Sequence, residues 1–163
     1  MQLRIAGIAN DSIVDGPGIR MTIFVQGCPH GCEGCHNPET HSFSGGEVVE
    51  VSEIARQAFE NPLLDGLTFS GGEPFMQCEA LCELADLAIA RGLNIIAYTG
   101  FVWEKLIQRA DAAELIKRCK YIIDGPFILA EKSLMLNFRG SKNQRIIDVQ
   151  KSLEGGEVCT VEL

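Results

Sequence analysis

Short apolar runs alternate with segments of helical periodicity along most of the chain. Five runs are of strand length, are rich in β-branched or aromatic residues, and mostly end in glycine or aspartate. They span residues 20–27, 66–72, 93–100, 120–125 and 144–149. We expect each of these runs to form a buried parallel strand.

Three intervening segments repeat their apolar positions with the period of a helix. They are residues 50–60, 74–91 and 102–118, and the third is expected to break near Asp111. Strands that alternate with helices indicate βαβ crossovers and a mostly parallel sheet. In such sheets ligands bind beyond the carboxyl ends of the strands, where the glycine-rich stretches of this chain fall.

The length of the chain limits the architecture. A closed eight-stranded barrel takes about 250 residues, whereas this chain has 163. We therefore predict an α/β fold, an open, partial (β/α) barrel of mostly parallel strands. Without repeats or linkers, residues 1–163 should form a single domain. Residues 152–163 are either a last strand or a tail.

Charge and composition exclude several classes of protein. The chain has 22 acidic and 14 basic residues, a net charge of -8, so direct nucleic-acid binding is not expected. It has no apolar run of 18 residues and no cleavage-site pattern at its start, which predicts a cytoplasmic protein that does not enter a membrane. In a reducing compartment its seven cysteines indicate metal ligands, catalytic thiols or small core residues rather than disulfides.

Three cysteines lie in one stretch, FVQGCPHGCEGCHN at residues 24–37. A structural zinc site needs four ligands, so zinc would have to recruit histidine from His30, His36 or His41. Three thiolates that hold a four-iron cluster would instead leave one iron with an open position, which is what chemistry at the metal requires. A cluster that only carries electrons would need a fourth cysteine.

The spacing C-x3-C-x2-C after a strand resembles the cluster loop of radical S-adenosylmethionine enzymes. Further motifs follow the same order as in part of that superfamily: DGPGIR, SGGEP, YTGF, DGPF and RGSKNQRIIDV. Residues 15–149 together resemble the activating enzymes of glycyl-radical enzymes, and most closely those of the anaerobic, class III ribonucleotide reductase.

The resemblance implies a radical S-adenosylmethionine oxidoreductase with a [4Fe-4S] cluster on Cys28, Cys32 and Cys35 and with S-adenosyl-L-methionine as the second cofactor. Reductive cleavage of this cofactor would give a 5′-deoxyadenosyl radical, which abstracts hydrogen from a glycine of anaerobic ribonucleoside-triphosphate reductase. Flavodoxin or a similar protein would donate the electron. The alternatives are an activase of another glycyl-radical enzyme such as pyruvate formate-lyase, a small iron–sulfur electron carrier, or a zinc-binding protein.

The residues expected to contact S-adenosylmethionine are Gly34, Cys35, His36, Gly71, Gly72, Glu73, Thr99 and Asp124. Glycines let backbone approach a ligand, and the Glu73 carboxylate suits the methionine ammonium. Thr99 and Asp124 end two strands, where they serve either a ribose or carboxylate or simply as caps. Many superfamily members have an aromatic residue where this chain has Gly34, so backbone groups are expected at the adenine. No catalytic side chain is assigned.

Two other groups of residues have alternative interpretations. Cys78, Cys82, Cys119 and Cys159 are expected to be small core residues, with a second metal site as the alternative. Residues 132–151 contain five basic residues against one acidic residue, and Arg20 is a further basic residue of interest. The run is either a solvated face or a docking surface for an acidic electron donor or the reductase.

Overall fold

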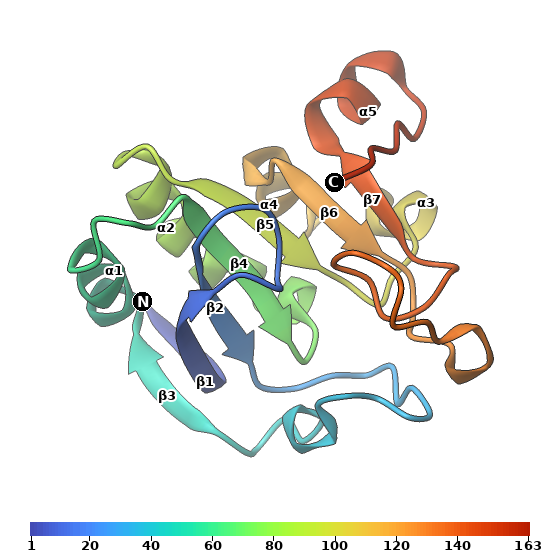
Figure 1. The fold of residues 1–163 in the computed structure, drawn as a ribbon. Coiled ribbons are helices and arrows are strands. Elements are labelled where there is room, and N and C mark those ends of the chain that lie inside the picture. The colour runs from blue at the N-terminus through green and yellow to red at the C-terminus, as the bar shows by residue number, and fades with distance from the viewer.

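The computed structural model describes residues 1–163. Seven strands form a single sheet in the order β3-β1-β2-β4-β5-β6-β7 (Figure 1). Their bounds are β1 Gln2–Ser12, β2 Arg20–Val25, β3 Glu47–Glu50, β4 Gly66–Gly71, β5 Asn94–Tyr98, β6 Tyr121–Asp124 and β7 Arg145–Asp148. The sheet is not closed, because β3 and β7 are its two edges. The prediction of an open α/β sheet is confirmed.

The four central strands are parallel, and the three outer ones are not. β2, β4, β5 and β6 pair in parallel, while β1 is antiparallel to both β2 and β3, and β7 is antiparallel to β6. The expectation of a parallel strand at residues 144–149 is therefore wrong. A parallel return needs a crossover, usually a helix, whereas residues 125–144 contain only the short 3-10 helix η3, Leu129–Glu131.

Four of the five α-helices fall close to the predicted segments, and the last helix was not predicted. The helices are α1 Val51–Phe59, α2 Cys78–Ile89, α3 Trp103–Leu106, α4 Ala113–Arg118 and α5 Val149–Gly155, together with the 3-10 helices η1 Pro38–Thr40 and η2 Pro74–Met76. The predicted break near Asp111 is confirmed by the gap between α3 and α4. The end of the chain is part of α5 and then a tail that pairs with β7 at one bridge, Ile147 with Thr160.

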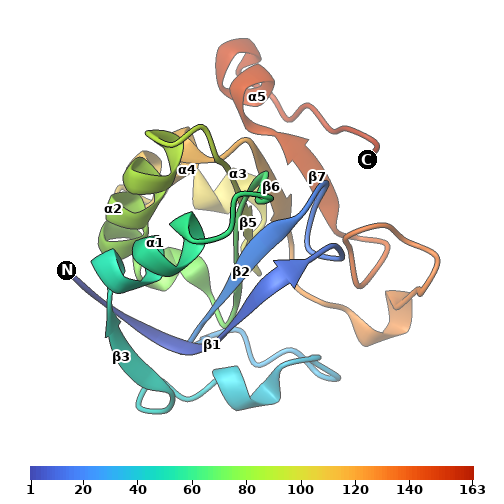
Figure 2. The same cartoon turned by 60° about the vertical axis from the view of Figure 1, so that its left-hand side comes forward.

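One face of the sheet carries most of the core. Figure 2 shows α1, α2 and α4 along this face, and a cluster of 30 buried hydrophobic residues lies around them. The other face has a small cluster of Ile96, Ile123 and Ile146. That uneven burial leaves room on the second face for a pocket. No helix is long and apolar enough to cross a membrane.

Candidate functional site

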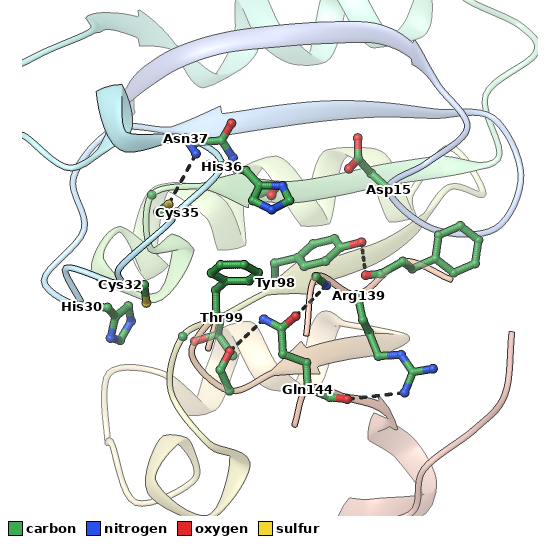
Figure 3. Close-up of a pocket in the computed structure, with 18 of the residues that line it drawn as sticks. Asp15, His30, Cys32, Cys35, His36, Asn37, Tyr98, Thr99, Arg139 and Gln144 are labelled. Atoms are coloured by element: carbon green, nitrogen blue, oxygen red, sulfur yellow. Dashed lines mark hydrogen bonds between the residues drawn. The ribbon is translucent and has the colours of Figure 1, made fainter. Parts of the chain in front are cut away.

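A pocket of about 610 Å³ lies at the carboxyl ends of the parallel strands. Its walls include residues 70–72 after β4, residues 98–100 after β5 and Gly125 after β6. Residues 13–15 before β2 and residues 136–140 before β7 close the far side. Figure 3 shows the cysteines at one end of this pocket and Asp15 and Arg139 at the other. The pocket is thus where an open parallel sheet is expected to bind its ligand.

The cysteine loop, residues 26–37, is shaped by glycines. Each of its three cysteines directly follows a glycine in the left-handed region: Gly27 with φ 105°, Gly31 with φ 59° and Gly34 with φ 73°. Residues with a side chain rarely adopt these angles, so the glycines permit three changes of direction within eight residues. As a result Cys28, Cys32 and Cys35 all line the same pocket.

The donor set of this loop fits an iron–sulfur cluster better than a single ion. Nowhere in the structure do three His, Cys, Asp or Glu side chains converge so that they could hold one metal ion. A zinc ion requires such convergence. In a four-iron cluster each thiolate binds a different iron, so three half-buried thiols that line one pocket are suitable. Burial raises the pKa of Cys28, so binding to iron would release its proton.

The structure encloses Glu73 behind the pocket wall. Its side chain is fully buried, and its carboxylate accepts hydrogen bonds from His30, Thr99, Gly100 and Phe75. Glu73 is not among the residues that line the pocket. The expected contact between Glu73 and a methionine ammonium therefore stays a prediction.

Most of the other predicted contact residues do line the pocket. They are Cys35, His36, Gly71, Gly72 and Thr99. The two glycines are also needed for packing, because a Cβ on Gly71 would lie 2.7 Å from backbone of Phe24, and one on Gly72 would lie 2.4 Å from the Gly27 carbonyl oxygen. Gly34 is exposed and does not line the pocket.

The carboxylate of Asp124 is held by partners within the protein. Its carboxylate accepts from the Trp103 backbone N–H at 2.8 Å and pairs with Arg145, whose Nη2 lies 2.5 Å from Oδ2. Asp124 is buried and does not line the pocket. The structure thus favours the interpretation of Asp124 as a cap. Its ion pair with Arg145 joins β6 to β7.

Several polar pocket residues were not among the expected contacts of the cofactor, including Asp15, Tyr98, Arg139 and Gln144. Gln144 binds both sides of the pocket end, since its Oε1 accepts from Gly140 N–H at 2.8 Å and its Nε2 donates to the Gly125 carbonyl at 3.1 Å. The Nε of Arg139 is buried without a partner. These residues lie within the motifs DGPGIR, YTGF and RGSKNQRIIDV, and that position could have identified them as site residues from the sequence.

The basic residues do not form one free surface. Arg20 is buried and donates to Thr68 Oγ1 at 2.8 Å and to the carbonyl of Leu67 at 2.9 Å, so it holds β2 against β4. Arg145 is paired with Glu104 as well as Asp124. Lys142 and Lys151 remain exposed.

Comparison with known proteins agrees with this site. The open sheet and the three-cysteine loop define an iron–sulfur protein with one cluster, and the family model of the 4Fe-4S single cluster domain matches residues 14–147. The anaerobic ribonucleoside-triphosphate reductase-activating protein of Haemophilus influenzae is 33% identical over 144 residues, which cover 82% of this chain and 90% of that protein. This chain belongs to the family of anaerobic ribonucleoside-triphosphate reductase-activating proteins.

Other similarities cover less of the molecules. The pyruvate formate-lyase-activating enzyme of Clostridium pasteurianum is 38% identical over 96 residues, 56% of this chain, and this chain spans only 40% of that relative. The crystal structure of QueE from Escherichia coli aligns with a TM-score of 0.48 and 20% identity over 61% of this chain and 53% of QueE.

Proposed function

We propose that this protein activates anaerobic ribonucleoside-triphosphate reductase by forming a radical on a glycine of that enzyme. The family relationship and the 4Fe-4S domain support this function. The observation that carries it is the cysteine loop, in which three glycine–cysteine pairs direct three thiols to one pocket at the strand ends.

In this proposal Cys28, Cys32 and Cys35 would hold a [4Fe-4S] cluster, which would supply the one-electron chemistry for reductive cleavage of S-adenosylmethionine to methionine and a 5′-deoxyadenosyl radical. The volume of about 610 Å³ is suitable for a ligand of nucleoside size. His36, Gly71, Gly72 and Thr99, together with Cys35, line the space for that ligand.

The chain's own part in the reaction is to orient the ligand and to keep water away from it. Phe127, Leu136 and Phe138 contribute apolar walls, which lowers the local dielectric and limits quenching of a reactive species. Tyr98 donates its hydroxyl to the Phe138 carbonyl at 2.7 Å and so fixes that wall. Orientation of the reacting groups is a large part of what a protein can add to such chemistry.

The same reasoning extends to the organisation and partners of the chain. A single domain over residues 1–163 is supported by one 30-residue core that draws on helices and strands from β1 to β7. The glycine of the reductase reaches the pocket between residues 13–15 and 136–140, and flavodoxin or a similar protein supplies electrons. No nucleic acid or membrane takes part.

The electron donor can be tested through the exposed lysines of the basic run. Lys142→Glu combined with Lys151→Glu should slow radical formation with flavodoxin, because charge reversal removes long-range steering of an acidic partner. Cleavage of S-adenosylmethionine driven by dithionite should stay near its wild-type rate. Equal loss of both activities would show that the lysines support the fold or the cofactor instead.

A second candidate is activation of pyruvate formate-lyase, favoured by the higher identity of the Clostridium relative. Coverage argues against it, since this chain spans 90% of the Haemophilus reductase-activating protein but 40% of the Clostridium enzyme.

The chemistry is tested by anaerobic reconstitution with iron and sulfide, followed by dithionite and S-adenosylmethionine. We expect 5′-deoxyadenosine to form in the wild type and not in a Cys32→Ala variant. A protein with full iron and sulfide content that forms none would contradict the proposed activity and leave the electron-carrier alternative.

A further inference from the structure

The carboxylate of Glu73 is surrounded by donors from three segments of the chain. It accepts from His30 Nε2 at 2.5 Å, from Thr99 Oγ1 at 2.9 Å and from the N–H groups of Gly100 at 2.8 Å and Phe75 at 3.1 Å. The side chain has no exposed surface. A buried carboxylate with this many donors is already stabilised within the protein, and Glu73 is not among the residues that line the pocket.

The hydrogen bond between Glu73 and His30 differs from the other hydrogen bonds of the cysteine loop. The start of the loop is held by the N–H groups of Gly27 and Cys28, which donate to the carbonyls of Thr40 and His41. Between residues 29 and 35 the other hydrogen bonds are local: Cys35 N–H to the Cys32 carbonyl, and Asn37 N–H to Cys35 Sγ. The His30–Glu73 contact is therefore the only hydrogen bond that connects this segment to a distant part of the chain.

The imidazole of His30 is enclosed in a slot that matches it. The ring meets the edge of Phe101 with centroids 4.7 Å apart, and a Cβ on Gly100 would lie 2.4 Å from the ring. Figure 3 shows His30 beside Cys32, at the same end of the pocket as Thr99. The slot thus brings together the cysteine loop, the turn after β4 and the end of β5.

We propose that Glu73 is a positioning residue that anchors His30, and that His30 in turn fixes the segment carrying Cys32 and Cys35 over the strand ends. This role is separate from the contact with a methionine ammonium that the sequence suggested for Glu73, which stays a prediction. It rests on the proposed function only for the identity of the group that the cysteines hold. A charge-assisted bond is suited to this task, because it is stronger than a bond between neutral groups.

The tether can be tested in the metal-free full-length chain by proteolysis. Glu33 is exposed in the middle of the loop, so the rate at which a glutamyl endopeptidase cleaves after Glu33 reports how often the segment opens. His30→Ala and Glu73→Gln should each raise this rate roughly tenfold or more. His30→Gln keeps a donor near the Nε2 position and should recover part of the protection.

His41→Ala is the matched control, because the His41 side chain makes no hydrogen bond and its residue lies just outside the cysteine loop. It should be cleaved at the wild-type rate. All variants are compared at a temperature where circular dichroism shows them folded. The His30→Ala, Glu73→Gln double variant should be cleaved no faster than the faster single variant, since both changes break one interaction.

Cleavage of His30→Ala at the wild-type rate, or rate increases that multiply in the double variant, would overturn the tether. Formation of 5′-deoxyadenosine by the reconstituted wild type is measured in parallel. If it forms while the proteolysis result is negative, the tether is wrong and the proposed function stands. If proteolysis behaves as expected and no 5′-deoxyadenosine forms, the tether stands and the proposed function is wrong.

Discussion

The chain contains the spacing C-x3-C twice, and the two copies have different structures. Cys28 and Cys32 lie in the cysteine loop, half-buried, and both line the pocket. Cys78 and Cys82 lie on α2, where Cys78 donates to the Phe75 carbonyl and packs in the core. The difference comes from the neighbours, because glycines precede the first pair while Gln77 and Leu81 precede the second. The spacing of cysteines alone therefore does not define a site.

The largest expected effect comes from removing one cysteine of each pair. Cys32→Ala should abolish cluster assembly, because three thiolates are the minimum that leaves one iron open. Cys82→Ala should leave iron and sulfide content unchanged and cost about 1 kcal/mol of stability from lost packing. Iron analysis after anaerobic reconstitution measures the iron content of both variants. Full iron content in Cys32→Ala would remove the distinction between the two pairs.

A smaller effect is expected from Gly72, which packs against the start of the cysteine loop. In Gly72→Ala the new Cβ would meet the Gly27 carbonyl oxygen at 2.4 Å, and backbone on both sides leaves little room to yield. We expect a loss of about 2 kcal/mol in the free energy of unfolding, together with weaker cluster retention. Gly155→Ala, where nothing lies within 4 Å of the added Cβ, is the matched control. Equal effects on unfolding by urea would contradict the packing argument.

The smallest effect concerns how stability depends on pH through the buried thiol of Cys78. Burial raises the pKa of Cys78 to about 12, so the folded protein keeps a proton that the unfolded chain loses near pH 8.5. Stability should then be present below that pH and decline as pH rises toward 12, by about 1.4 kcal/mol per pH unit. Cys78→Ala should flatten the pH dependence of unfolding between pH 9 and 10. An unchanged slope would mean that the thiol is hydrated in the folded state.

Much of the fold could be predicted because apolar periodicity records burial on the helix-covered face. The strands at residues 20–27 and 66–72 and the break near Asp111 follow from this pattern. β1 and β3 were not predicted, since QLRIAGIANDS and EVVE are half-exposed segments without a continuous apolar run. The antiparallel direction of β7 depends on a loop that has no helical pattern to reveal it.

The site was predictable where one residue type serves one purpose, as in the thiols of the cysteine loop. It was not predictable where a residue has competing partners. The sequence GGEP places a carboxylate near a pocket, but only tertiary structure shows that His30 and Thr99 surround Glu73. Asp124 likewise meets Arg145, 21 residues along the chain, through strand pairing that motif spacing does not contain.

The central claim is that the three thiols support transfer of a hydrogen atom from a partner glycine to the 5′-deoxyadenosyl group. It is tested most directly with anaerobic ribonucleoside-triphosphate reductase labelled with deuterium at the α-carbon of its glycines. The reconstituted protein, S-adenosylmethionine and dithionite are added, and the 5′-deoxyadenosine is analysed by mass spectrometry. The account predicts that the product is one mass unit heavier and that a glycyl-radical signal appears in electron paramagnetic resonance. Unlabelled 5′-deoxyadenosine without a glycyl radical would contradict it.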